Sequence, residues 1–186
     1  NNKDIDKNLE ILKNSKIFLT QMETPDEVTI YSLKKAKEND CLTILNPAPA
    51  RKINEENFAL IDFFTPNETE AEFYLNNKIT TEEDIKIAGK EFLKKGVKNI
   101  IITLGERGVY FANENEEYFI DALKLKDQVV DTTGAGDAFN GAFAVGLADD
   151  LKFKDALIFA NKVAGISTTR AGAASSMPTF KEVNNY

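Results

Sequence analysis

The sequence predicts an α/β fold with a mostly parallel central sheet and an antiparallel edge. Short apolar runs of strand length alternate with helical patterns from Lys16 to Thr103, as expected for strands joined by right-handed crossovers. A tight connection at 105–108 then leads into two closely spaced strand-like runs, which indicates antiparallel pairing. We expect helices to cover both faces of this sheet.

The chain up to residue 103 contains four apolar runs with the length of a buried strand. These strands are expected at 16–20, 42–45, 60–65 and 99–103. Helices are expected around 6–13, from Thr24-Pro25-Asp26-Glu27 onward, after Pro66-Asn67-Glu68, and from Thr80-Thr81-Glu82-Glu83 to Lys94-Lys95. Gly96 can end the last helix in a left-handed conformation.

Two of these helices carry recognisable apolar residues. On the helix that starts near Asp26, the apolar stripe consists of Val28, Leu33 and Ala36. Its charged residues form most simply a solvated face, which comprises Lys34, Lys35, Lys37 and Glu38. On the helix after Asn67, the apolar residues are Ala71, Phe73 and Leu75.

The second half predicts a strand pair followed by two helices. Strands are expected at 109–112 and 116–120. A Gly-rich turn follows Asp131, and apolar residues between 138 and 147 predict a well-buried helix, with a second helix over 154–168. Because no repeat, low-complexity tract or clear linker interrupts the chain, residues 1–186 are expected to belong to one domain.

Composition argues against several classes of function. The 30 acidic and 23 basic residues give a net charge of -7, which disfavours general attraction to nucleic acid or an anionic membrane. The absence of histidine removes Ser-His-Asp triads and the usual zinc sites. Cys41, the one cysteine, is expected to be a buried thiol in a reducing compartment. No apolar stretch approaches about 20 residues, so a cytoplasmic protein is expected.

The most informative segment runs from Val130 to Gly141, because its small residues let backbone N–H groups approach an anion at a helix start. Asp137 is expected in the first helical turn, where a carboxylate is favoured by the helix dipole. It would also lie beside the bound anion, where its repulsion calls for a role such as a general base. A structural cap is the alternative, since Gly-rich turns before helices are common.

This segment, Asp131-Thr132-Thr133-Gly134-Ala135-Gly136-Asp137 followed by Phe139-Asn140-Gly141, resembles the signature of the ribokinase branch of the PfkB carbohydrate kinases. The resemblance implies a ribokinase-like three-layer fold and transfer of the γ-phosphoryl group of ATP to a sugar. It implies that Asp131 helps to hold a monovalent cation and that Asp137 deprotonates the sugar hydroxyl. The implied anion hole consists of Gly134, Ala135 and Gly136.

Two further segments resemble the family's nucleotide site. Thr65–Glu72 resembles its Asn-x-x-Glu element, which implies that Asn67 and Glu70 organise Mg²⁺, water and the triphosphate. A helix cap formed by the same two residues is the alternative. A second segment resembles the family's nucleotide-binding turn and consists of Thr103, Leu104, Gly105, Glu106, Arg107 and Gly108. A plain hairpin connection is the alternative for these residues. Asn161 matches a position near the adenine, or is a plain polar residue of a helix.

Near the end of the sequence, Ser167–Pro178 resembles the loop that completes the family's monovalent-cation site. The resemblance implies that Asp131 and Thr133 are joined there by oxygens of Ser167, Arg170, Gly172 and Ser176. A set of mostly neutral carbonyl oxygens suits K⁺ better than a transition metal. A surface loop of small residues is the alternative.

Two segments point to D-ribose as the sugar. Gln21–Pro25 resembles the segment whose Glu contacts the sugar, so Glu23 is the candidate, unless it is only an acidic residue near a helix start. Asn46-Pro47-Ala48-Pro49-Ala50 matches a run found in the family. The family's N-terminal portion, with another sugar-contacting Asp and a small lid sheet, has no counterpart, so this chain resembles the C-terminal portion of such a kinase.

The expected function is therefore phosphorylation of D-ribose at its 5-hydroxyl, with ATP, Mg²⁺ and K⁺ and without a nucleic-acid or membrane partner. A homodimer is considered for the full-length protein. One alternative is a related PfkB kinase for fructose derivatives or nucleosides, which differs in the upstream sugar contacts. The other is a nucleotide-binding module that lacks transfer, which an assay of ribose-dependent ADP release would identify.

Overall fold

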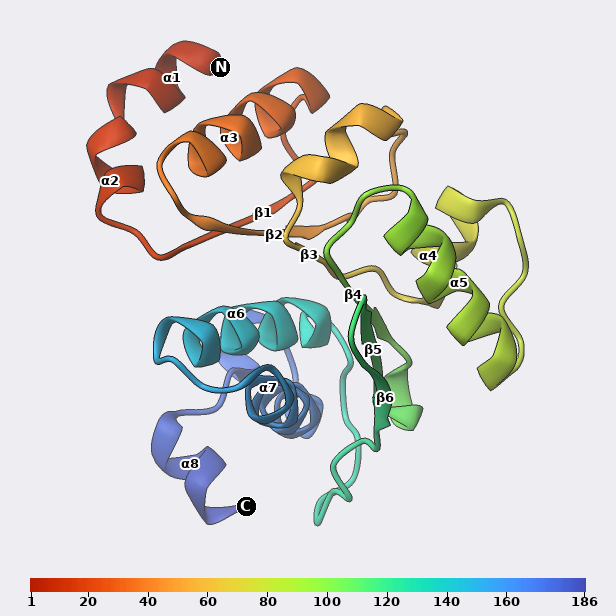
Figure 1. Ribbon diagram of the computed structural model, residues 1–186. Helices are drawn as coiled ribbons and strands as arrows, with labels where there is room; N and C mark the ends of the chain where they lie inside the picture. The colour runs from red at the N-terminus through yellow and green to blue at the C-terminus, as the bar shows by residue number, and fades with distance from the viewer. The chain divides into compact units, whose positions relative to one another are not determined.

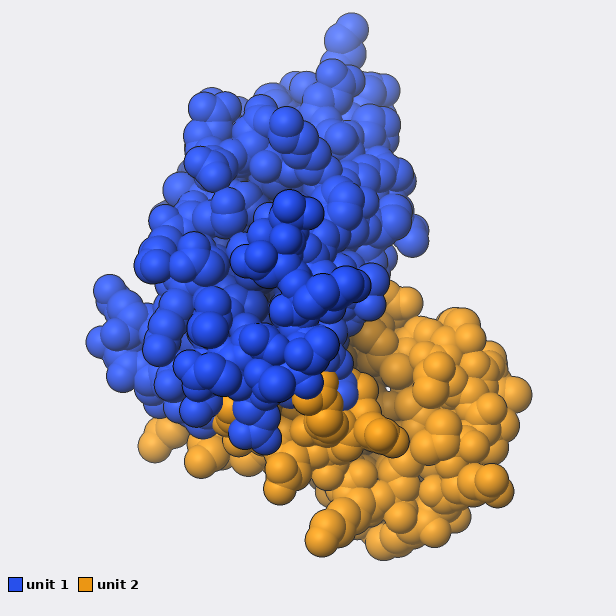
Figure 2. Space-filling view, turned by 90° about the vertical axis from the view of Figure 1, so that its right-hand side faces the viewer, with its two compact units in different colours: residues 1–104, 110–118 blue, residues 105–109, 119–186 orange.

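The computed structural model describes residues 1–186, which form two units (Figure 2). Unit 1 comprises residues 1–104 and 110–118, and unit 2 comprises residues 105–109 and 119–186. The assignment of all 186 residues to a single domain stays a prediction. None of the helices is both long and apolar enough to cross a membrane.

Six strands form one sheet in the order of the sequence (Figure 1). The parallel strands are β1 (Ile17–Gln21), β2 (Leu42–Asn46), β3 (Phe63–Phe64) and β4 (Asn99–Thr103). The remaining strands are β5 (Val109–Asn113) and β6 (Glu117–Ile120). The connections over 104–108 and 114–116 are too short for a parallel crossover, so β5 and β6 run antiparallel to their neighbours. The predicted mostly parallel sheet with an antiparallel edge is confirmed.

Helices α3 and α5 of unit 1 pack on the same face of the parallel strands. The connecting elements are α3 (Asp26–Glu38), the 3-10 helix η1 (Glu55–Leu60), α4 (Glu68–Leu75) and α5 (Glu82–Lys94). Phe18 of β1 packs against a buried cluster that includes Ala36 of α3, and the ring of Phe64 in β3 lies 5.2 Å from that of Phe92 in α5. The strand register places Phe18 and Phe64 on one face, which is the arrangement that right-handed crossovers between successive neighbours produce.

Local sequence signals set the ends of α5, as predicted. The side chain of Thr81 accepts a hydrogen bond from the N–H of Asp84, while the Asp84 carboxylate accepts one from the N–H of Thr81. These bonds satisfy donors that the first turn cannot pair internally. At the other end, Gly96 adopts a φ of 101°, a conformation that glycine takes without a steric penalty.

Two predicted elements differ from the structure. The helix expected over 6–13 is divided into α1 (Asn2–Lys7) and α2 (Leu9–Lys13). The side-chain amide of Asn8 donates to Asp4 O, an alternative to continued helical bonding that ends α1. The strand expected over 60–65 is reduced to two residues, because η1 continues to Leu60 and Pro66 has no N–H for a ladder bond.

Aromatic side chains fill the core between β3 and its covering helices. The buried ring of Phe64 lies 5.5 Å from that of Phe58 and 5.4 Å from that of Tyr74. Tyr74 is thus the core aromatic residue of α4, whereas its neighbour Phe73 is 54% exposed. The reason is the helical period. Tyr74 lies three positions after the buried Ala71 and shares its face of the helix, whereas Phe73 lies two positions after it and points elsewhere.

Unit 2 consists mainly of α6 (Ala135–Ala148) and α7 (Phe153–Ser167), which pack against each other (Figure 1). Their contact is close, because a Cβ atom added to Gly146 would lie 3.0 Å from the Cβ of Ala156. Phe139 and Phe143 are buried, as expected for a well-buried helix, whereas Val145 on the outer face is 49% exposed. A short 3-10 helix, η3 (Ala174–Ser176), and α8 (Phe180–Asn185) follow, and neither was predicted.

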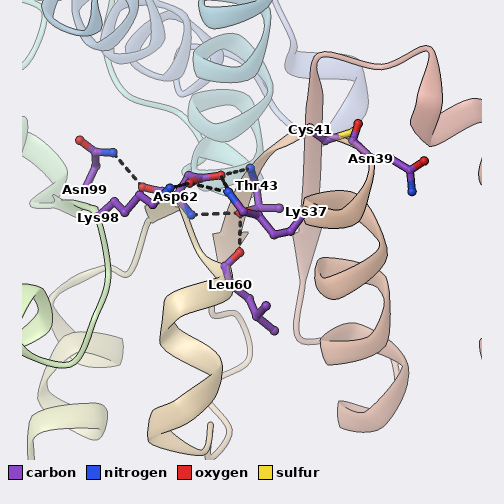
Figure 3. Close-up of polar contacts among 8 residues, drawn as sticks. All are labelled: Lys37, Asn39, Cys41, Thr43, Leu60, Asp62, Lys98 and Asn99. Atoms are coloured by element: carbon purple, nitrogen blue, oxygen red, sulfur yellow. Dashed lines mark hydrogen bonds and ion pairs between the residues drawn. The ribbon is translucent and has the colours of Figure 1, made fainter.

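Asp62 connects α3 to the amino ends of the parallel strands (Figure 3). Its side chain, only 3% exposed, accepts from Lys37 Nζ at 2.7 and 2.9 Å and from the N–H of Thr43 at 2.9 Å. Lys98 pairs with it at 2.9 Å. Burial by itself raises the pKa of Asp62, but the two lysines and Thr43 outweigh this and lower it. The prediction that Lys37 belongs to a solvated face was therefore wrong.

We expect Asp62→Ala to lower the free energy of unfolding by about 3 kcal/mol at pH 7, because Lys37 and the buried N–H of Thr43 lose their acceptor. The pKa of the folded carboxylate is lowered, so its contribution is complete above the unfolded pKa of about 3.9 and disappears as the pH falls through the folded pKa. The difference between wild type and variant should therefore narrow below about pH 4.

Urea unfolding at several pH values measures both effects. The matched control is Glu38→Ala, which removes the exposed partner of Lys35 on the same helix and should change the unfolding midpoint far less. Equal losses for the two variants, or a difference that does not change with pH, would contradict this account of Asp62.

Candidate functional site

The carboxyl ends of the parallel strands bring together the predicted site residues of unit 1. In parallel α/β sheets, ligands bind at this edge. Gln21 Nε2 donates to Asn46 Oδ1 at 3.0 Å, and the N–H of Met22 donates to Ala48 O at 2.9 Å. The segments that follow β1 and β2 therefore lie side by side. Glu23 is exposed next to Met22, where a ligand can reach its carboxylate.

Asn67 and Glu70 form a helix cap at the start of α4, so the structural alternative for these residues is confirmed. Asn67 Oδ1 accepts from the N–H of Glu70 at 2.8 Å, and Glu70 Oε2 accepts from the N–H of Asn67 at 2.9 Å. Asn67 also forms a parallel bridge with Thr103 at the end of β4. Burial raises the pKa of Glu70, and the bond from Asn67 partly opposes it. In the cap, Glu70 uses one carboxylate oxygen, and its other oxygen is the one that could contact Mg²⁺ or its water. The role of Glu70 with Mg²⁺ stays a prediction.

The turn that resembles a nucleotide site contains the 3-10 helix η2 (Gly105–Arg107). Gly105 and Gly108 have φ values of 58° and 92°, in the region that favours glycine. At Gly108, an added Cβ atom would lie 2.0 Å from Ile120 O, so no larger residue fits. The side chain of Leu104 is buried, which leaves only its main chain for a ligand, whereas Glu106 and Arg107 are exposed.

The Gly-rich motif forms the first turn of α6, as predicted. Gly134 is the N-cap with φ 76°, and an added Cβ atom would lie 3.1 Å from the Cβ of Ala173. The N–H of Ala135 donates to Thr132 O at 3.2 Å. The N–H of Gly136 lies in the first turn, where the helix supplies no acceptor, so it is the motif amide best placed for an anion. Asp137 follows it and is exposed.

Asp131 connects this motif to the loop after α7. One carboxylate oxygen accepts from the N–H of Gly172 and the other from the N–H of Thr133, both at 2.9 Å. The hydrogen bond from Gly172 has the largest effect, and together these bonds lower the pKa of Asp131 to about 2. The N–H groups of Val130 and Asp131 also donate to Thr168 O at 2.8 and 3.1 Å. Residues 130–134 and 168–173 therefore form one structure, although some 40 residues separate them in the sequence.

The predicted donor set that includes Asp131 has the chemistry of a monovalent-cation site. All six predicted ligands offer oxygen, and Asp131 supplies the one carboxylate among Asp131, Thr133, Ser167, Arg170, Gly172 and Ser176. No group of three or more His, Cys, Asp or Glu residues in the structure could hold a metal ion. Ser176 is buried, and its hydroxyl donates to Ala173 O at 2.7 Å, so the oxygen can still accept or coordinate. Such a site suits K⁺ rather than a transition metal.

Two asparagines of unit 2 have structural partners. Asn161 Nδ2 donates to Asp121 O at 2.7 Å, which attaches α7 to the chain after β6 and leaves the amide oxygen for the predicted adenine contact. Asn140, which was not predicted as a site residue, is 3% exposed and donates to Gly136 O at 2.9 Å. It stabilises the turn that carries Gly136 and Asp137. Asn140 could have been found from the sequence, because it is an amide side chain on the apolar face of a predicted helix, and a buried amide needs a hydrogen-bond partner.

A helix start with free backbone N–H groups, on an α/β sheet, is the kind of position at which proteins of this class can bind phosphate groups. The family model described as "pfkB family carbohydrate kinase" matches residues 1–180. The chain belongs to this family. A curated relative, the ribokinase of Staphylococcus aureus, is 40% identical over 174 residues, which cover 92% of this chain and 56% of the relative.

Two solved structures that share this fold are ribokinases. A ribokinase from Thermotoga maritima is 41% identical, with a TM-score of 0.87 over 100% of this chain and 60% of its own. A structure of Arabidopsis thaliana ribokinase complexed with ribose and ATP is 35% identical, with a TM-score of 0.92 over 97% of this chain and 58% of its own. The ribokinase-like fold is confirmed, and the chain spans little more than half the length of these relatives.

Proposed function

We propose that this protein is a kinase that transfers the γ-phosphoryl group of ATP to the 5-hydroxyl of D-ribose. The observation that carries the proposal is the first turn of α6, where Gly136 offers a backbone N–H and Asp137 an exposed carboxylate. Membership of the carbohydrate kinase family and the similarity to ribokinases, one of them complexed with ribose and ATP, support it. The residue roles below belong to the same proposal.

Asp137 is the general base of the proposed reaction. It accepts the proton of the sugar hydroxyl while that oxygen attacks the γ-phosphorus, and the bond from this phosphorus to the β-phosphate oxygen breaks to release ADP. The N–H of Gly136 donates to the phosphoryl oxygens as their charge develops, and the dipole of α6 favours the same charge. No covalent intermediate on the protein is needed.

The remaining residues position the two substrates. Asn67 and Glu70 are proposed to hold Mg²⁺ through water near the triphosphate, where the ion would neutralise phosphate charge. The nucleotide lies against the turn over 103–108 and near Asn161, and Glu23 binds the sugar. K⁺ would be held by Asp131 and the loop over 167–176, outside the reacting atoms. Its role is to fix the turn at Gly134, which packs against Ala173.

Competing sugar acceptors test the substrate assignment. We would measure ADP release with D-ribose, 2-deoxy-D-ribose, D-fructose and adenosine, in a form of the protein that includes the N-terminal sugar-binding portion implied by the family resemblance. The expected result is a kcat/KM for D-ribose higher than for any other acceptor. A preference for fructose or the nucleoside would replace the proposed substrate, whereas ATP binding without transfer to any acceptor would favour the nucleotide-binding module.

We expect Asp131→Asn to weaken activation by K⁺ while leaving Asp137 in place. The substitution removes the negative charge but keeps an oxygen that can accept from Gly172. The K⁺ concentration for half-maximal activation should rise by about 10-fold or more, as for loss of a metal-ligand partner. The measurement is the rate of ribose phosphorylation across a K⁺ titration at constant ionic strength. An unchanged K⁺ response would remove Asp131 from the cation site.

A further inference from the structure

The C-terminal helix α8 is fixed to unit 2 at both of its ends. Thr179 caps its start, and the side chain of Val183 is 3% exposed. The ring of Phe180 lies 5.9 Å from that of Phe159 in α7. Although α8 has little more than one turn beyond its cap, these contacts give it a defined position on the unit.

One end of α8 holds the loop that follows α7. Glu182 Oε1 pairs with a guanidinium nitrogen of Arg170 at 2.9 Å. The other carboxylate oxygen accepts from the N–H of Thr179 at 2.7 Å and from its hydroxyl at 2.8 Å. Both oxygens of Glu182 therefore have partners, and the ion pair places Arg170 in a fixed position relative to α8. Arg170 belongs to the loop assigned to the cation.

The other end of α8 holds the segment that precedes the Gly-rich motif. The hydroxyl of Tyr186 accepts from the N–H groups of Lys126 and Asp127 at 3.2 and 3.3 Å and donates to the Asp127 carboxylate at 3.0 Å. Lys126 Nζ lies 4.9 Å from the centroid of the Tyr186 ring. This segment leads directly into Val130 and Asp131.

The two segments that α8 holds are the same two that meet at Asp131. Thr168 O accepts from the N–H of Asp131, and the carboxylate of Asp131 accepts from the N–H of Gly172. A site of weak carbonyl ligands on two loops binds an ion well only if the loops are ordered before the ion arrives, because ordering each residue costs about 1–2 kcal/mol. Groups behind the ligands that fix their orientation therefore affect ion affinity.

We propose that Glu182 and Tyr186 are positioning residues for the monovalent-cation site, and that α8 keeps the loops over 126–134 and 167–176 in the arrangement that binds K⁺. The inference rests on the proposed cation site. It adds that part of the affinity for K⁺ comes from a helix that supplies no ligand to the ion.

The test measures K⁺ binding directly, through the thermal unfolding midpoint of the chain in KCl, with tetramethylammonium chloride keeping the ionic strength constant. Binding to the folded state raises this midpoint as the K⁺ concentration increases. In Glu182→Gln, which keeps an acceptor for Thr179 but removes the charge facing Arg170, the half-saturating K⁺ concentration should rise by about 10-fold. In Tyr186→Phe, which keeps the ring, it should rise as well.

Thr179→Ala is the matched control, because it weakens the cap of α8 and keeps the Glu182–Arg170 pair. Its half-saturating K⁺ concentration should stay within about twofold of wild type, a change far below that expected for a lost supporting group. The exchanged pair Arg170→Glu with Glu182→Arg should restore K⁺ binding towards wild type, which a general loss of helix stability would not do. This recovery would support the ion pair as the cause.

Two results would overturn the inference in distinguishable ways. If Asp131→Asn weakens the K⁺ response while Glu182→Gln and Tyr186→Phe respond like wild type, the cation site is supported and the role of α8 is wrong. If the unfolding midpoint of wild type does not respond to K⁺ at all, both the proposed cation site and the proposed role of α8 are wrong. Equal effects of Glu182→Gln and Thr179→Ala would also overturn the role of α8.

Discussion

Asp137→Asn is expected to lower kcat for ribose phosphorylation by about 10²-fold or more while nucleotide affinity changes little. The amide has nearly the shape of the carboxylate, but it cannot accept the proton of the attacking hydroxyl. Because Asp137 is exposed in the first turn of α6, the substitution leaves the core intact. The measurement is steady-state ADP release, combined with calorimetric titration of ATP, in the active form of the protein.

Asp155→Asn provides the matched control for this prediction. Asp155 is also an exposed carboxylate in the first turn of a helix, α7, so the control changes the same chemical group in the same helical position. It should leave both kcat and ATP affinity near the wild-type values. If Asp137→Asn turns over like Asp155→Asn, Asp137 has no catalytic role and its carboxylate is a helix cap.

The polypeptide of these 186 residues alone is expected to bind ATP measurably and to phosphorylate little or no ribose. Its predicted ATP contacts are present, whereas most of the sugar pocket and the lid that the family resemblance implies are not. Positioning of two reactants can account for about 7–11 kcal/mol of a reaction barrier. A general base cannot compensate for the loss of that positioning, nor for the loss of water exclusion by a lid.

Calorimetric titration with ATP and a coupled ribose assay test the two parts of this expectation. The matched comparison is the same chain with the upstream residues restored, which should show ribose-dependent ADP release. Robust turnover by the 186 residues alone would mean that the site needs less than we propose. Absence of ATP binding would contradict the assignment of the nucleotide contacts to this chain.

The isolated polypeptide is also expected to self-associate. β1 is the last strand on its side of the sheet, and Leu19 and Leu42 are 37% and 40% exposed beside this edge. An unpaired edge with apolar neighbours is a template for pairing with another chain. Light scattering should show association that increases with concentration and disappears when the upstream residues are restored. A monomer at high concentration would contradict the expectation.

Features governed by neighbours in the sequence were predicted closely. The strand at 99–103, the Thr81 cap and the left-handed Gly96 depend on apolar periodicity, on capping bonds within three residues, or on the freedom of glycine. Where two local effects compete, the sequence alone was insufficient. The helix expected over 6–13 is interrupted at Asn8, whose side chain offers the backbone a different hydrogen bond.

The candidate site divides in the same way. The motif at 131–137 could be located from the sequence, because small residues before a helix are a local pattern that lets backbone N–H groups approach an anion. Its partners could be named only through resemblance to a family. The bond from Gly172 to Asp131 and the ion pair between Glu182 and Arg170 join loops that local rules treat separately.

The sequence by itself determined the order and type of most elements, the left-handed Gly96 and the position of the Gly-rich motif, since these depend on interactions within a few residues. Only the tertiary structure decided that Lys37 pairs with Asp62, that Tyr74 rather than Phe73 enters the core, and that α8 holds both loops at Asp131. The physical reason is that a buried polar group must find a partner, and packing decides which distant residue is within reach.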